Sequence, residues 1–216
     1  MNKGIELLNE GKMEEAAKFF TDEIEQKPTD PVGYINFGNL LLHIQDFERA
    51  EKFFEKAIEL DNQAATAHYG LGNVFFEQEN YKKAQQHFQQ ALDLGLKEAD
   101  VYFLLGISFQ KQDHHKLSLP YLQRAQELNP EEEAILFQYG LALAQTSQVD
   151  VAKEVFEDVL KLNNDHSDAY YNLGVCYLYQ EDVDRALENF TKAVEIQPDH
   201  LLAANGKKKI EELLTD

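Results

Sequence analysis

"YYNLG" at residues 170–174 is the last of five similar stretches that end in glycine. The earlier ones are "YINFG" (34–38), "HYGLG" (68–72), "YFLLG" (102–106) and "LFQYG" (136–140). Each closing glycine stands 34 residues after the previous one, and Gly4 precedes the first of them at the same interval. A self-similarity at one fixed period predicts a repeat architecture.

Two further positions recur when each glycine is numbered 8 in a 34-residue unit. Position 20 is small and position 24 is a large apolar residue. Around them, "ERAEKFFEKAIEL" (48–60) places its apolar residues three and four apart, the spacing of one helical face. Turn signals such as "KPTDP" (27–31) end these stretches, which predicts two helices per unit. The residues at the two positions are Ala16, Ala50, Ala84, Ser118, Ala152 and Ala186, and Phe20, Phe54, Phe88, Leu122, Phe156 and Phe190.

This pattern resembles the tetratricopeptide repeat family, whose signature is W-x2-L-G-x2-Y, then A-x3-F, then Pro. In the second 34-residue repeat, the residues that match the signature are Tyr34, Gly38, Ala50 and Phe54. The resemblance implies an all-α, right-handed superhelical solenoid of antiparallel helix pairs. We expect one solenoid over residues 1–200, with units 1–30, 31–64, 65–98, 99–132, 133–166 and 167–200.

The two ends and the fourth unit depart from the pattern. Residues 201–216 predict a C-terminal capping helix, because a terminal repeat needs a polar outer face. We expect Ala203, Ile210, Leu213 and Leu214 to point inward from this helix. In the fourth 34-residue repeat, Pro120 removes a backbone donor from the second helix, so this repeat should be the least regular.

The composition excludes several classes of protein. The 216 residues carry 39 Asp and Glu against 20 Lys and Arg, a net charge of -19, which opposes nucleic-acid binding and self-association. No stretch approaches the roughly 18–20 consecutive apolar residues of a membrane span. One cysteine and a charged, non-signal-like N-terminus favour the cytoplasm. We therefore expect an acidic cytoplasmic protein, mostly monomeric, that binds neither nucleic acid nor membrane.

In the family, the first helix of each unit lines a concave surface through positions 2, 5, 6, 9, 12 and 13. On this chain these helices are nearly free of charge, and most carboxylates fall on second helices and loops. We expect a groove of aromatic and amide side chains with an acidic rim, suited to an extended peptide. Its candidate peptide-binding residues are Asn36, Asn39, Tyr69, Asn73, Phe76, Phe103, Gln110, Phe137, Gln138, Tyr171, Asn172 and Tyr179.

The predicted function is that of a non-enzymatic adaptor that binds a peptide or protein segment, with Lys or Arg flanking apolar anchors in the partner. A self-assembling scaffold that uses the same groove or its edges is the alternative. Aromatic residues at position 5, such as Phe103 and Phe137, fit core packing and ligand contact equally. The asparagines fit a groove role, and simple solvation stays open for them.

Other kinds of site find little support in the residues. The family members that grip a partner's C-terminal carboxylate need cations where this chain has Ile35, Tyr69 and Asp100, so we reject that mode. His166 and His200 recur one unit apart, as loop residues would. Cys176 is expected to be a buried small apolar residue. We expect no catalytic group, no metal site and no cofactor.

Overall fold

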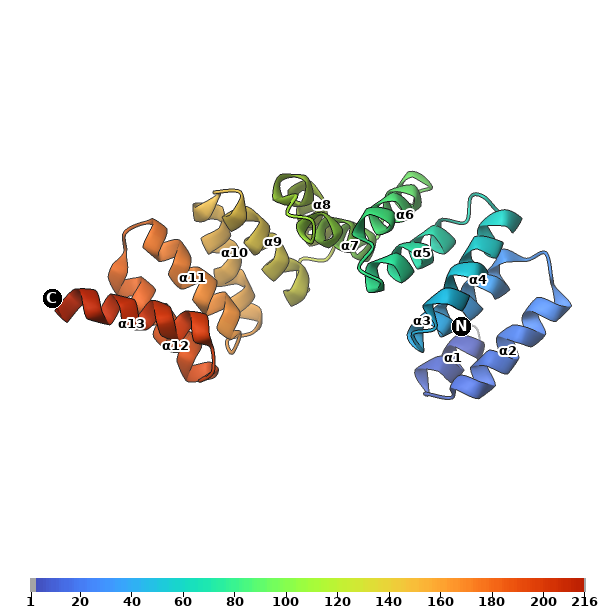
Figure 1. Cartoon of the computed structure of the whole chain (residues 1–216), viewed down its shortest axis with the longest axis horizontal. Coiled ribbons are helices and arrows are strands. Elements are labelled where there is room, and N and C mark those ends of the chain that lie inside the picture. The colour runs from blue at the N-terminus through green and yellow to red at the C-terminus, as the bar shows by residue number, and fades with distance from the viewer. Residues whose placement is uncertain (1–2, 216) are drawn as a thin grey trace. The chain divides into compact units, whose positions relative to one another are not determined.

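The computed structural model describes residues 3–215, which form thirteen helices and no strand (Figure 1). The chain divides into two compact units, residues 1–112 (unit 1) and residues 113–216 (unit 2), at a point inside the fourth 34-residue repeat. The predicted all-α array of helix pairs is confirmed. Unit 1 contains α1 (Lys3–Asn9), α2 (Met13–Gln26), α3 (Pro31–His43), α4 (Phe47–Leu60), α5 (Ala65–Glu77), α6 (Tyr81–Asp93) and α7 (Ala99–Gln110). Unit 2 contains α8 (His115–Leu128), α9 (Glu133–Gln145), α10 (Val149–Leu162), α11 (Ser167–Tyr179), α12 (Val183–Ile196) and α13 (Leu201–Thr215).

Within each unit every helix packs against the next one along the chain. The large apolar residue at position 24 explains this packing, as Phe54 of α4 shows. Its side chain is fully buried, and a Cβ atom added to Gly38 of α3 would lie 2.8 Å from its ring. A Cβ on Gly70 of α5 would also collide with that ring. Phe54 therefore packs between two glycines, one in its own repeat and one in the next.

Unit 2 repeats this arrangement at its end. Phe190 of α12 is 1% exposed and packs between Gly174 of α11 and Gly206 of α13. An added Cβ would lie 2.7 Å from the ring at Gly174 and 2.9 Å from it at Gly206. Each of these glycines is needed for a close approach of a helix to an aromatic ring, so even alanine would force the ring or the helix to move.

The turn from the first to the second helix of each repeat uses a left-handed residue. Gly11 has a φ of 75°, and the positions that follow it at 34-residue intervals also have positive φ without being glycine. The second helix then often starts with a side-chain cap: Asp46 Oδ1 accepts from the Arg49 N–H at 3.3 Å. Such caps satisfy backbone donors that the helix leaves free. The left-handed residues are Gln45 (62°), Glu79 (58°), Asp113 (59°), Ser147 (67°) and Glu181 (61°).

Two local features test the expectations about irregular regions. Helix α8 continues through Pro120, and Leu122, which takes the place of phenylalanine, has no exposed surface.

In α13, Ala203 and Ile210 are buried as expected, whereas Leu213 and Leu214 are 76% and 61% exposed. The inward direction predicted for these two leucines is wrong. No helix among residues 3–215 is both long enough and apolar enough to span a bilayer.

Candidate functional site

A recess in unit 1 is formed at the ends of its first helices. It has a volume of about 330 Å³. The ends of α3 and α5 contribute most of the lining, α7 contributes one leucine, and Gln45 and Phe47 come from the turn after α3 and the start of α4. The residues that line it are Leu42, His43, Gln45, Phe47, Asn73, Phe76, Glu77 and Leu104.

The structure distributes the predicted residues of unit 1 unevenly around this recess. Asn73 and Phe76 line it. Of the others, Asn39 is exposed and the rest are partly buried. The side chains of Asn36 and Asn39 have no hydrogen-bond partner within the described residues. The predicted binding residues of unit 1 that do not line the recess are Asn36, Asn39, Tyr69, Phe103 and Gln110.

Tyr69 shows what position 5 does in unit 1. Its ring lies 5.9 Å from the ring of Phe88, the position-24 residue of the same repeat, and stays partly exposed. Burial raises the pKa of Tyr69, and a hydrogen bond with the Asn73 side chain acts in the opposite direction. The tyrosine is therefore part of the packing on one edge and accessible on the other.

The predicted residues of unit 2 follow the same rule. The Phe137 ring packs 5.9 Å from Phe156, the Tyr171 ring packs 5.7 Å from Phe190, and both are partly exposed. Gln138 is also partly buried. Asn172 uses its Nδ2 to donate to the backbone oxygen of Asp168 at 2.8 Å, so its second N–H and its Oδ1 are left for a ligand. Tyr179 is the most accessible of the set, with 76% of its surface exposed.

His166 and His200 do more than the loop role predicted for them. The Nδ1 of His166 accepts from the Ala169 N–H at 3.3 Å, and the Nδ1 of His200 accepts from the Ala203 N–H at 3.2 Å. Each histidine therefore caps the helix that follows it, α11 for His166 and α13 for His200. Sequence reasoning missed this role because the usual capping residues are Ser, Thr, Asp and Asn. The only available signal was that both precede a helix start at the same repeat position.

These histidines also reach back to the preceding first helix. The His166 ring lies 4.5 Å from the Phe137 ring, and the His200 ring lies 5.2 Å from the Tyr171 ring. The Nε2 of His200 is 3.1 Å from Asp168 Oδ1, with the oxygen off the N–H direction, so the contact is electrostatic rather than a hydrogen bond. A capping side chain that leaves Nδ1 unprotonated carries its proton on Nε2, which faces this carboxylate.

A histidine pair in unit 1 has a different character. The Nδ1 atoms of His68 and His87 lie 3.3 Å apart, which is hydrogen-bond distance for one protonated and one unprotonated nitrogen. Burial, then the charges of His68 and Lys83, lower the pKa of His87 to about 4. The ring of Phe75 stacks on His87 at 5.4 Å. The pair is therefore neutral and internally satisfied at neutral pH.

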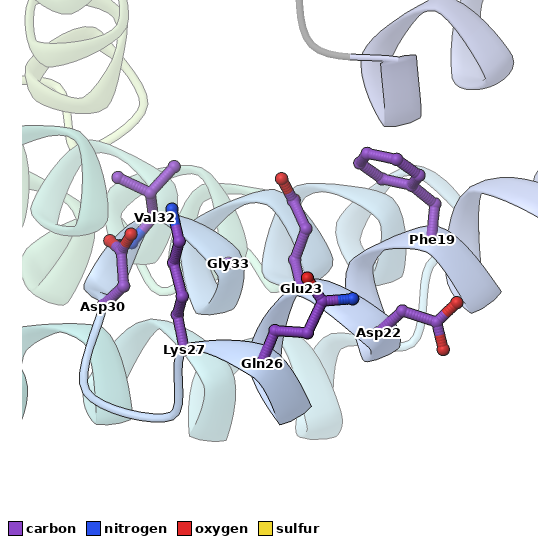
Figure 2. A pocket seen from close by; sticks show the side chains of 8 residues that line it. All are labelled: Phe19, Asp22, Glu23, Gln26, Lys27, Asp30, Val32 and Gly33. Carbon is purple, nitrogen blue, oxygen red and sulfur yellow. The ribbon is translucent and has the colours of Figure 1, made fainter.

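The remaining polar recesses offer little chemistry. Figure 2 shows one between the end of α2 and the start of α3, lined by the carboxylates Asp22, Glu23 and Asp30 and by a single cation, Lys27. None of the predicted site residues lines it. Burial raises the pKa of the Cys176 thiol to about 11, which keeps it protonated and unreactive. Across residues 3–215, no three His, Cys, Asp or Glu side chains gather in a way that could hold a metal ion.

Comparisons with known proteins agree with this architecture. Models described as tetratricopeptide repeat match residues 31–97, 63–131, 134–166 and 167–200, which is well over half of the chain. The chain belongs to the tetratricopeptide repeat family. A search of curated protein sequences gives no match.

Solved structures of other members of the tetratricopeptide repeat family superimpose on the chain. YrrB, described as a TPR protein with an unusual peptide-binding site, is 46% identical, with 89% of this chain and 99% of that chain covered and a TM-score of 0.85. MamA is 23% identical over 78% of this chain and 92% of that chain, with a TM-score of 0.72. PilF of Pseudomonas aeruginosa is 16% identical over 95% and 94%, with a TM-score of 0.81. The last two similarities show the fold alone.

Family membership makes a protein-interaction module the general function of the chain. Members of the family bind protein or peptide partners and are generally not enzymes. The described residues agree with a binding role, since they present partly exposed aromatic rings and amides on helices that the core holds in place.

Proposed function

We propose that this protein is a non-enzymatic adaptor that binds an extended peptide segment along its first helices. The observation that carries the proposal is the recess of unit 1, where an amide, Asn73, and an aromatic ring, Phe76, stand side by side on α5. Aromatic faces accept apolar side chains of a peptide, and amides both donate to and accept from its backbone.

Two further facts support a peptide as the ligand. Asn36 and Asn39 of α3 keep their amides unbonded within the described chain, so binding would break no internal hydrogen bond of theirs. The relative YrrB, 46% identical, is described as having a peptide-binding site. We extend peptide binding, although not the position of that site, to this chain.

The partner and the cellular setting follow from the charge. The chain has a net charge of -19 but few charges on its first helices. The surface of the first helices is therefore nearly uncharged, and the acidic residues lie on the second helices and loops around it. We propose a partner with Lys or Arg beside its apolar anchors, bound more weakly as salt is added. We also propose a cytoplasmic protein that is mostly monomeric, because like charges oppose self-association.

Alanine substitution of the amides tests this function. A peptide selected from a random 12-residue library on the wild-type chain should bind Asn36→Ala, Asn39→Ala and Asn73→Ala more weakly. Each variant should lose roughly 0.5–1.5 kcal/mol of binding free energy, the net value of one hydrogen bond. Asn164→Ala, in the exposed turn after α10, is the matched control. Equal affinity for all four variants would rule out the amide surface.

The alternative function, a self-assembling scaffold, draws support from apolar side chains at the end of unit 2. Tyr179 and Leu213 are each 76% exposed and Leu201 is 75% exposed. Light scattering over a wide concentration range distinguishes the two functions. A constant monomer mass supports the adaptor, whereas a stable oligomer that Tyr179→Ser dissociates supports the scaffold.

A further inference from the structure

We propose that the recess of unit 1 is a subsite for a basic side chain of the bound peptide, with the carboxylate of Glu77 as its anionic contact. This inference rests on the proposed function, because it assigns one position of the same peptide. It also goes further, since it names the residue that recognises the charge and the place where the cation lies.

The walls of the recess fit a long side chain with an apolar stem. Leu42, Phe47, Phe76 and Leu104 all line it, and each is only partly buried, so apolar surface of each remains accessible. Lysine and arginine bury their methylene stems along such surface while the charged group stays at the edge. The two phenylalanine rings add aromatic faces, on which a guanidinium stacks favourably.

The charge at the rim selects a cation. Glu77 is the one carboxylate in the lining, and it is exposed at the last residue of α5. Many other carboxylates of the chain already have a cation, as in the pair of Lys52 with Glu48 at 2.6 Å. Within residues 3–215, Glu77 has no such ion pair and no side-chain hydrogen bond. A peptide cation can therefore meet this carboxylate without breaking an internal pair.

The other polar groups nearby are compatible with this assignment. His43 and Gln45 also line the recess, and neither is a lysine or an arginine. Lys111 holds the position in the next repeat that Glu77 holds in its own; it is not in the lining, and among the described residues it forms no ion pair with Glu77. A single carboxylate does not suffice for a metal ion, whereas it suffices for one side-chain cation.

Selection from a random 12-residue peptide library tests the subsite. The full-length chain is used as wild type, Glu77→Gln, Glu77→Lys and Glu79→Gln. Glu79 is the matched control: it lies two residues away, outside the lining, and its left-handed position is occupied by glutamine in the preceding repeat, at Gln45. Melting curves should be alike for all four proteins, since both glutamates are exposed.

We expect the wild type to enrich peptides with Lys or Arg next to an apolar residue. The best of these peptides, made synthetically, should bind Glu77→Gln about fivefold more weakly at low salt, the effect of one largely exposed ion pair. Glu79→Gln should retain the wild-type affinity. Glu77→Lys should enrich peptides with Asp or Glu instead.

The outcomes separate the two levels of the proposal. If the wild type enriches no peptide above a bare support, peptide binding itself fails and the subsite fails with it. If it enriches peptides without basic residues, or if Glu77→Gln and Glu79→Gln bind the best peptide equally, the subsite is overturned while peptide binding stands. Continued selection of basic peptides by Glu77→Lys would also overturn it.

Discussion

The two units differ at the residue that precedes each first helix. In unit 1 this residue is Asp30, Ala64 or Glu98, and only Asp30 caps its helix through the side chain, by accepting from the Val32 N–H at 3.0 Å. In unit 2, Glu132 does not cap α9, whereas His166 and His200 cap α11 and α13 and also contact an aromatic ring and a carboxylate of the preceding first helix.

This difference shows that the residue before a helix can either cap that helix alone or also contact the helix of the preceding repeat. The short carboxylate side chain of Asp30 contacts only the helix that it caps. An imidazole has two nitrogens on opposite sides of a flat ring, so it caps with one and contacts its neighbour with the other. We therefore expect His166 and His200 to add to the contact between successive helices at the end of unit 2.

The largest expected effect concerns the packing that both units share. Phe54→Ala in unit 1 and Phe190→Ala in unit 2 should each cost about 3–5 kcal/mol of unfolding free energy, because each empties a fully buried site between two glycines. Urea unfolding followed by circular dichroism measures the loss. If one variant lost far more than the other, the contrast between the units would lie in the apolar core and not in the helix starts.

The histidine cap should have the next largest effect. His200→Ala removes the cap of α13 and the contacts with Asp168 and Tyr171, so it should cost about 1–2 kcal/mol. Glu132→Ala changes the same repeat position where no side-chain cap exists, and its effect should stay within about 0.5 kcal/mol. His200→Asn keeps a cap and should fall between them. Equal melting temperatures for His200→Ala and Glu132→Ala would remove the basis of the comparison.

Acid should act on unit 1 through its own histidine pair. The pKa of His87 is about 4 in the fold, below the usual 6.5, so the unfolded chain binds more protons between these values. The stability from the neutral pair is complete above pH 6.5 and is lost as the pH falls toward 4. Partial exposure reduces the effect to roughly 1 kcal/mol.

Hydrogen exchange in α5 and α6, measured from pH 7 to pH 4 with correction for the intrinsic rate, checks this prediction. His87→Gln should flatten the pH dependence in these two helices. If the variant keeps the wild-type profile, another group causes the loss.

The smallest effect should be equal in the two units. Gln45→Gly and Glu181→Gly place glycine at left-handed turn residues with φ of 62° and 61°. Relief of the left-handed conformation, about 1–2 kcal/mol, is offset by roughly 0.5–1 kcal/mol of extra freedom in the unfolded chain. Both variants should therefore be slightly more stable in thermal melts. A loss of stability in either one would show that the side chain contributes more than the strain costs.

The sequence allowed the helices to be predicted because the period of 34 residues aligns every position. The recurring positions 8 and 24 hold Gly38 and Phe54 in one repeat and Gly174 and Phe190 in another, and in the structure each glycine lies against the buried ring of its own repeat. The second glycine at each ring was harder to foresee. Gly70 and Gly206 belong to the following repeat, so their role depends on how one repeat stacks on the next.

The rest depended on side-chain geometry that periodicity does not determine. The recess brings Asn73 and Phe76 together as candidates, but it adds Phe47 and Gln45, which lie outside the first helices. The capping by His200 depends on the tautomer and ring direction of a residue type that seldom caps. Leu213 was expected to be buried from its place on the helical face, yet that face continues past its last covered position, Ile210.

The placement of Phe54 between two glycines also has a consequence for how the chain folds as it is made. Gly38 lies sixteen residues before Phe54 and Gly70 sixteen residues after it (54 − 38 and 70 − 54), so half of the ring's cover is synthesised first and half later. On the ribosome, this ring stays partly bare until residue 70 has left the exit tunnel. The second repeat is thus complete at residue 64 while this ring still lacks the cover that α5 provides. At this ring, and in the same way at Phe190 with Gly206, folding therefore follows synthesis by sixteen residues, about half a repeat (70 − 54 and 206 − 190).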